Sequence, residues 1–193
     1  LQHLSCAERD GVDFVQSKTL LFDIETAPAL GWVWEKYETN VIEFEKQWTI
    51  LCVGYKWLNG KTHIITGKEK SIVKKIRDLL DKADIVIGHN SDCFDIKKVN
   101  TRIAYYKLQP PSRYKTIDTL KLVKKHWGLL SNHLGDIGDY LGLGKKLETG
   151  GFKLWKGCME GDKKSWKLMI NYCKNDVILL EKVYLRILPF MVK

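Results

Sequence analysis

The chain lacks long apolar runs and paired cysteines. No segment of its 193 residues approaches the roughly 18 consecutive apolar residues of a membrane span. The N-terminus also lacks the basic-then-apolar order of a signal peptide. The five cysteines are scattered and form no CxxC pair, which favours reduced thiols and argues against a zinc site. These absences predict an intracellular protein, cytoplasmic or nucleoid-associated, that is neither secreted nor bound to a membrane.

Internal repeats, low-complexity tracts and linkers rich in Pro, Gly or Ser are also missing. With 193 residues, 45% of them hydrophobic, the chain is long enough for one well-buried domain. We expect an N-terminal extension over residues 1–17 and a single domain over residues 18–193. Because the sequence begins at Leu1 and not at Met, we also expect it to be a piece of a longer protein with flanking domains.

Positive charge is in excess. The formal net charge is +9 and the sequence pI is about 9.2. Such a balance favours a polyanionic partner, nucleic acid first and a membrane surface second. A solvated, lysine-rich surface explains the same charge equally well, so charge alone does not choose a function.

The pattern of apolar residues predicts alternating strands and helices. Strands or extended pieces are expected over residues 18–24, 48–57, 61–66, 85–87 and 114–117. Asn59-Gly60 is a strong turn signal between the second and third of these. Helices are expected over residues 69–81, 92–107, 132–141 and 163–188, with one more that starts at Asp118 as its N-cap. This order predicts an α/β fold with a mixed sheet and helices packed on its faces.

Two segments lack a clear period. Residues 27–46 are dense in aromatic and acidic side chains, and we expect an irregular insertion near the mouth of the site. Residues 142–164 are rich in Gly and Lys, and we expect a loop.

The sequence FDIET places Asp23 and Glu25 two residues apart at the end of the first strand. Since side chains alternate along a strand, both carboxylates leave the same face of the sheet. Two adjacent carboxylates repel each other, and an oxygen-preferring cation such as Mg²⁺ or Mn²⁺ would relieve that repulsion. A D-x-E pair alone is common, so its place at the end of a buried strand is what favours function.

The sequence NSDCFD, residues 90–95, adds a third acid after the strand at residues 85–87. Asp95 is expected in the first turn of the next helix, where it would face a metal, while Phe94 would pack against a bound base. Complementing the helix dipole is an adequate explanation of Asp92. It does not explain Asn90 or Phe94.

The sequence NYCKNDV supplies the fourth acid. Tyr172 and Asp176 are at i and i+4, so they are neighbours on one face of the last helix. Taken alone, Tyr172 is most simply an ordinary residue at a helix flank. The same spacing separates Tyr114 from Asp118, but that pair falls in an extended segment and would not share a face. We therefore favour Tyr172 and Asp176.

In the order D-x-E, N-x-x-x-F-D and Y-x-x-x-D, the three motifs resemble those of the DEDD superfamily of 3′–5′ exonucleases, in its tyrosine-bearing (DEDDy, DnaQ-like) branch. FDIE, NSDCFD and YCKND are most similar to the exonuclease domain of family B DNA polymerases and its stand-alone relatives. The resemblance covers residues 18–188. It implies a ribonuclease-H-like α/β fold, a single domain whose mixed sheet is flanked by helices.

The resemblance also implies a reaction and a site. Two divalent cations, Mg²⁺ or Mn²⁺, would be held by Asp23, Glu25, Asp95 and Asp176. Tyr172 would orient the attacking water. The substrate would be the 3′ end of single-stranded or frayed DNA, and the products nucleoside 5′-monophosphates. Four carboxylates roughly offset the charge of two such cations, which agrees with this interpretation.

Other residues near the motifs are weaker candidates. Thr26, Asn90 and Phe94 flank the acids and are expected to contact the terminal nucleotide. Arg102 lies seven residues after Asp95 on the same helix face, where it would hold substrate. Four loop lysines offer a second group of phosphate contacts, although solvation explains each one more simply: Lys145, Lys146, Lys153 and Lys156. His89 is expected to be structural.

Two alternatives stay open. The first is a 3′–5′ exoribonuclease with the same chemistry, because no motif reads the 2′-hydroxyl group. The second is a nucleic-acid-binding domain without catalysis, against which the complete set of four acids and Tyr172 argues. DNA, with RNA as the alternative, is the predicted partner, together with a protein of replication or repair.

Overall fold

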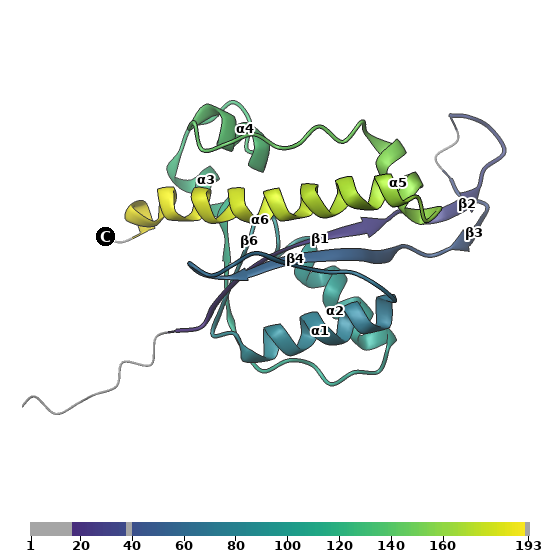
Figure 1. Ribbon diagram of the computed structural model, residues 1–193, viewed down its shortest axis with the longest axis horizontal. Coiled ribbons are helices and arrows are strands. Elements are labelled where there is room, and N and C mark those ends of the chain that lie inside the picture. Colours follow the sequence, from purple (N-terminus) through teal and green to yellow (C-terminus); the bar gives the residue numbers. More distant parts are fainter. Residues whose placement is uncertain (1–16, 38–39, 192–193) are drawn as a thin grey trace, which may run out of the picture.

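A five-stranded mixed sheet organises the residues that this computed structural model describes, 17–37 and 40–191 (Figure 1). The strands are β1 (Thr19–Ala27), β4 (Thr49–Trp57), β5 (His63–Ile65), β6 (Ile85–Gly88) and β7 (Lys115–Asp118). Their order is β5-β4-β1-β6-β7. β1 pairs antiparallel with β4 and parallel with β6, so it lies at the centre of the sheet. Apart from Ser17, the predicted N-terminal extension lies outside the described residues.

Helices cover both faces of this sheet. One face is covered by α1 (Glu69–Lys82) and α2 (Asp95–Tyr105). The other is covered by α3 (Thr119–His126), α4 (Leu134–Tyr140), α5 (Phe152–Met159) and α6 (Lys163–Met191) (Figure 1). None of the helices in the described part of the chain is long and apolar enough to cross a membrane.

Alternation along β1 separates two hydrophobic cores. Leu20, Phe22 and Ile24 pack on the side of α1 and α2, whereas Leu21 packs on the side of α6. Each fully buried side chain of this size contributes about 1.5–3 kcal/mol to folding. Because Asp23 and Glu25 follow Leu21 at intervals of two, the same alternation turns both acids toward α6.

The predicted mixed sheet with helices on its faces is confirmed. Asn59 adopts a positive φ of 62° in the predicted hairpin turn, and the Asp118 side chain caps α3 by accepting from the backbone N–H of Leu120. The predicted last helix is present as α6, and it buries one stripe of side chains: Met169, Cys173, Val177, Leu180 and Tyr184.

The clearest differences from the prediction lie in three segments. The expected loop over residues 142–164 contains α5, which forms because Leu154 and Cys158 are buried against α6 and the sheet. The expected helix start at Asp92 moves to Asp95, because the backbone N–H groups of Asn90 and Asp92 donate to the Asp118 carboxylate and hold this segment in a turn. The insertion over residues 27–46 includes a second sheet, made of β2 (Leu30–Trp32) and β3 (Glu43–Lys46).

Candidate active site

Asp23 and Glu25 lie on the α6 side of β1, opposite Gly54 and Cys52 of β4. At Gly54 a Cβ atom would come within 2.9 Å of the Cys173 backbone oxygen. Only a glycine therefore lets α6 lie this close to the sheet beside Asp23. This close approach brings the carboxylates of β1 within reach of side chains on α6.

From α6, Asp176 joins these two acids. Carboxylate oxygens of Asp23, Glu25 and Asp176 all lie within 4.8 Å of one another. Asp176 is only 1% exposed, and Glu25 is 9% exposed. Tyr172, one turn earlier on α6, packs its ring edge-on against Trp155 of α5. The structure thus brings together three of the four predicted acids, with the predicted tyrosine beside them.

The fourth acid, Asp95, is the first residue of α2, which covers the face of the sheet opposite α6. The pairing of β1 with β6 runs only as far as Leu21 and Ile87. Beyond it, the backbone N–H of Ile24 donates to the Asp95 carboxylate at 3.0 Å. This bond replaces the hydrogen bond that a neighbouring strand would otherwise make, so the buried N–H of Ile24 still has an acceptor. It also fixes Asp95 next to Asp23. Asp95 is itself 4% exposed.

Burial raises the pKa values of these carboxylates, and for Asp23 and Glu25 the neighbouring acids raise them further. Burial, then repulsion from Asp95, Glu25 and Asp176, raises the pKa of Asp23 well above its usual range. Burial and the neighbouring Asp176 raise the pKa of Glu25 to about 7. Burial likewise raises the pKa of Asp95 to about 7, against the bond from Ile24. Without a cation the cluster therefore keeps protons that isolated carboxylates would lose.

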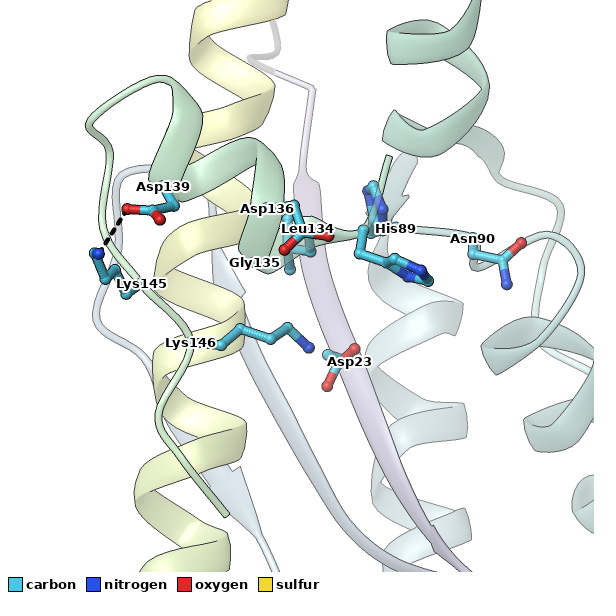
Figure 2. Close-up of a pocket in the computed structure, with 10 residues that line it drawn as sticks. Asp23, His89, Asn90, Leu134, Gly135, Asp136, Asp139, Lys145 and Lys146 are labelled. Atoms are coloured by element: carbon cyan, nitrogen blue, oxygen red, sulfur yellow. Dashed lines mark ion pairs between the residues drawn. The ribbon is translucent and has the colours of Figure 1, made fainter. Parts of the chain in front are cut away.

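Lys146 is the residue that sequence reasoning missed as part of this cluster. Its Nζ donates to the Asp176 carboxylate at 2.7 Å and lies 3.1 Å from the Tyr172 hydroxyl. Burial works against its charge, but Asp176 raises the pKa of Lys146 above its usual value. Figure 2 shows its side chain reaching across the cavity toward Asp23. The only sequence signal was its place among four loop lysines, which did not distinguish it from the others.

The cluster fits a divalent cation. Asp176 Oδ1 is buried and has no hydrogen-bond partner within the described part of the chain. A buried carboxylate oxygen without a donor is destabilising, and a cation would satisfy it. The candidate ligand atoms of Asp23, Glu25 and Asp176 are all carboxylate oxygens, which are the preferred ligands of Mg²⁺ and Mn²⁺.

A polar cavity of about 720 Å³ opens beside the acids (Figure 2). Asp23 lies on its wall together with His89, Asn90 and Lys146, and α4 closes one side. Both ring nitrogens of His89 are engaged, one with the Thr119 hydroxyl and one with the Asn132 carbonyl oxygen, each at 2.9 Å. His89 therefore ties the end of β6 to the neighbouring segments, which fits the structural role predicted for it.

Of the remaining predicted substrate contacts, Thr26 and Phe94 are each next to an acid in the sequence, whereas Arg102 is not. Thr26 follows Glu25 at an irregularity in the β1–β4 pairing. Phe94 precedes Asp95 and is 40% exposed. Arg102 is instead buried and paired with Glu69 of α1, with Tyr106 beside it. Its guanidinium group is thus engaged by another acid. Arg102 also lines a groove that begins at Ala27, and its contact with substrate stays a prediction.

Comparison with known proteins identifies the family to which the chain belongs. A family model described as the RNase_H superfamily matches residues 20–188. The chain belongs to the RNase_H superfamily. As a member of this superfamily it has a ribonuclease-H-like nuclease fold, so the predicted fold class is confirmed.

A solved structure agrees with this assignment. The chain is similar to the family B DNA polymerase from the hyperthermophilic archaeon Pyrobaculum calidifontis, with a TM-score of 0.69 and 16% sequence identity. The similarity covers 91% of this chain but only 25% of the polymerase chain. No curated protein matches the sequence. At this identity the likeness shows a shared fold alone, and the evidence for activity must come from the site itself.

Proposed function

We propose that this protein is a metal-dependent 3′–5′ exonuclease that acts on single-stranded or frayed DNA ends. The observation that carries the proposal is the convergence of Asp23, Glu25 and Asp176 within 4.8 Å, with Asp95 bonded to the backbone N–H of Ile24, between Asp23 and Glu25 on β1. The four carboxylates are buried or half-buried, and the protein supplies too few cations to neutralise them. In the absence of a ligand, this arrangement destabilises the folded state. Their arrangement is favourable once divalent cations and phosphate are present.

The reaction would be hydrolysis of the last phosphodiester bond. The oxygen of a water molecule bonds to phosphorus, the bond from phosphorus to the 3′ oxygen of the preceding nucleotide breaks, and that oxygen takes up a proton. The products are a nucleoside 5′-monophosphate and a strand shorter by one nucleotide. Divalent cations held by the four acids would supply an activated water and neutralise charge on the leaving oxygen.

Tyr172 and Lys146 have complementary roles in this proposal. Burial and the neighbouring Asp176 raise the pKa of Tyr172 to about 12, so its phenol stays protonated at neutral pH and acts as a hydrogen-bond donor. Tyr172 would orient the attacking water through that hydroxyl. Lys146, at 3.1 Å from the same hydroxyl, fixes the orientation of the phenol and contributes positive charge where phosphate would bind.

The test is digestion of a 5′-labelled single-stranded DNA oligonucleotide and of its RNA counterpart, each with Mg²⁺, Mn²⁺ or EDTA. We expect a ladder that shortens from the 3′ end of the DNA and depends on the metal. Equal or faster shortening of the RNA would support the exoribonuclease alternative.

Asp176→Ala is the control variant, because it removes one ligand of the cluster and leaves the other three acids. The ladder should be absent with this variant. If the unmodified protein cleaves neither strand but still binds it, the chain is a nucleic-acid-binding domain on a nuclease fold and the catalytic proposal is wrong.

A further inference from the structure

A second concave surface lies on the other side of the acids, and neither the motifs nor the proposed reaction uses it. This groove has a volume of about 1200 Å³ and begins at Ala27, two residues after Glu25. Its walls come from separate elements: Tyr105 of α2 on one side, Phe152 of α5 on another, and Leu30 of β2 and Lys46 of β3 at the end. The groove therefore begins two residues beyond Glu25 on β1, although none of the four acids lines it.

Aromatic side chains that are not needed for the core border this groove. Tyr105 is 66% exposed and Phe152 is 63% exposed, although both line it. Trp48, just before β4, forms a further part of the wall. The small sheet of β2 and β3 adds exposed Trp32 and Phe44 next to the groove residues Leu30 and Lys46. In Figure 1 this sheet projects beyond α5, past the C-terminal end of β1.

Positive charge lies between these rings. Lys98 Nζ lies 3.8 Å from the centre of the Trp48 ring and 5.3 Å from that of Phe94. Since Phe94 precedes the acid Asp95, this lysine links the acid cluster to the wall of the groove. Lys46, Arg102 and Lys156 also line the groove, together with one acid, Glu160, which lies 3.8 Å from Lys156.

We infer that this groove binds unpaired bases of the substrate strand next to the scissile phosphate, with Tyr105 and Phe152 as stacking platforms and Lys46, Lys98 and Lys156 as phosphate contacts. The inference rests on the proposed function. Two features favour a single strand over a protein segment: lysines lie among exposed aromatic side chains, and the groove begins two residues after Glu25 on β1. In a duplex the base faces are stacked on one another, so only unpaired bases have free faces for these rings.

The inference also gives the β2–β3 sheet a role. Trp32 and Phe44 extend the aromatic surface outward from the groove, so longer single strands gain contacts that short ones lack. Binding should therefore strengthen with length over oligothymidylates of about 2 to 16 nucleotides. It should weaken with added salt, because lysines that contact phosphates displace counterions.

The experiment measures anisotropy of fluorescein-labelled oligothymidylates with Mg²⁺, using proteins that also carry Asp176→Ala so that the DNA is not degraded. The double variant Tyr105→Ala/Phe152→Ala should bind at least about tenfold more weakly, since each stacked base contributes about that factor or more. Trp32→Ala/Phe44→Ala should weaken binding of the long strand and leave the short one unchanged. Tyr140→Ala, a change at an aromatic residue that is 76% exposed on α4, should bind like its parent.

Two further comparisons separate stacking from misfolding. Tyr105→Trp/Phe152→Trp should restore binding, because it restores the aromatic faces. A blunt duplex should bind more weakly than the single strand.

If Tyr105→Ala/Phe152→Ala binds like Tyr140→Ala, the inference is wrong, and a protein segment becomes the better occupant of the groove. That result leaves the proposed function intact if the unmodified protein still shortens DNA. Binding through the groove without any cleavage would instead support the groove as a single-strand site and contradict the proposed exonuclease activity.

Discussion

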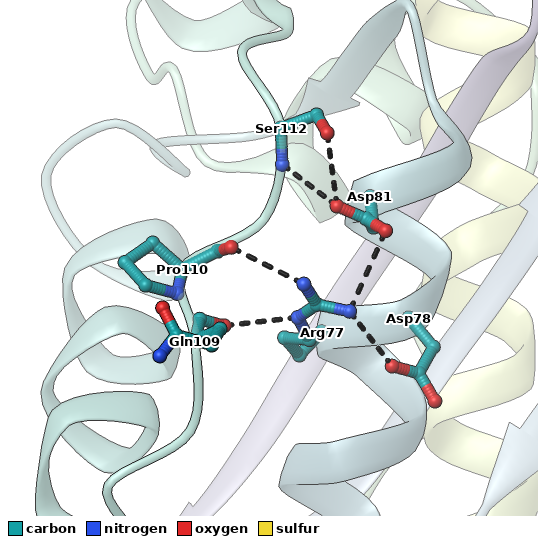
Figure 3. A network of polar contacts seen from close by, with 6 residues as sticks. All are labelled: Arg77, Asp78, Asp81, Gln109, Pro110 and Ser112. Atoms are coloured by element: carbon teal, nitrogen blue, oxygen red, sulfur yellow. Dashed lines mark hydrogen bonds and ion pairs between the residues drawn. The ribbon is translucent and has the colours of Figure 1, made fainter.

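Asp81 on α1 and Asp23 on β1 are both aspartates in polar clusters, but their neighbours have opposite effects. Asp81 accepts from the backbone N–H and the hydroxyl of Ser112 and pairs with Arg77 at 3.4 Å (Figure 3). Arg77 also donates to the carbonyl oxygens of Gln109 and Pro110, so this network fastens the segment after α2 to α1. Bonds from Ser112, with help from Arg77, lower the pKa of Asp81.

Asp23 has the opposite surroundings. Burial and three neighbouring carboxylates raise its pKa, and only Lys146 opposes them. The first cluster satisfies its acid inside the protein, and the second leaves its acids to be satisfied by something that binds. A group of like charges held together by a rigid sheet is therefore the better indicator of a functional site.

The largest difference between the two clusters should come from Asp23→Asn. We expect nuclease activity to fall by more than about 100-fold, since even partners of metal ligands cost about 10 to 100-fold. In the metal-free protein, folding must either protonate Asp23 or hold its charge next to the other carboxylates. The neutral Asn avoids both costs, so the free energy of unfolding should rise by about 1 kcal/mol or more; one unit of pKa shift corresponds to about 1.4 kcal/mol. Oligonucleotide digestion and urea unfolding in EDTA measure the two effects. A less stable variant would show that Asp23 supports folding.

Lys146→Met removes the cation bonded to Asp176, so it should increase the contrast between the two clusters. Without this cation, the acids should bind Mn²⁺ about tenfold more tightly in a calorimetric titration, because the lysine and the metal compete for the same carboxylate. Lys145→Met is the matched control, since Lys145 pairs with Asp139 on α4 and not with the acids. Weaker metal binding by Lys146→Met would mean that the lysine supports the ligand set.

A pH series should separate the clusters without any mutation. Unfolded Glu25 and Asp95 ionise near 4.5 and 3.8, whereas the folded, metal-free protein holds their protons up to about 7. The folded state then binds more protons, so its stability should fall as pH rises from about 4 to about 7. Asp81 has a lowered pKa, so its contribution should be lost only as pH falls below its ordinary value of 3.8.

Added Mg²⁺ should remove this loss of stability, because the bound cation favours the ionised acids. The increase in melting temperature caused by Mg²⁺ should therefore grow between about pH 5 and pH 8. Melting curves with Mg²⁺ and with EDTA across this range measure it. An increase that stays constant with pH would contradict the assignment of the acids as ligands.

The smallest effect is expected from Asp81→Ala. It removes the acceptor of both Ser112 bonds, so the melting temperature should fall by about 2–4 °C, while DNA digestion stays unchanged. Asp78→Ala removes only an exposed partner of Arg77 and should shift the melting temperature less. Equal shifts in the two variants would mean that the Ser112 bonds contribute nothing.

The order of the elements and the identity of the acids were predictable from local pattern. Alternation along β1 already turns Asp23 and Glu25 to one face, and helical spacing alone puts Tyr172 and Asp176 side by side. These properties depend on residues within a few positions of each other. Backbone geometry sets them before any long-range contact forms.

Contacts between distant segments decided the rest. α5 forms where pattern predicted a loop, because burial of Leu154 and Cys158 outweighs a sequence rich in Gly and Lys. Arg102 turns to Glu69, 33 residues away, and Lys146 turns to Asp176, 30 residues away. Which of many lysines meets an acid depends on how the sheet and α6 bring separate segments together. Local pattern is therefore enough to predict the acids and the order of the elements that carry them, whereas long-range packing selects the cation that the acids meet.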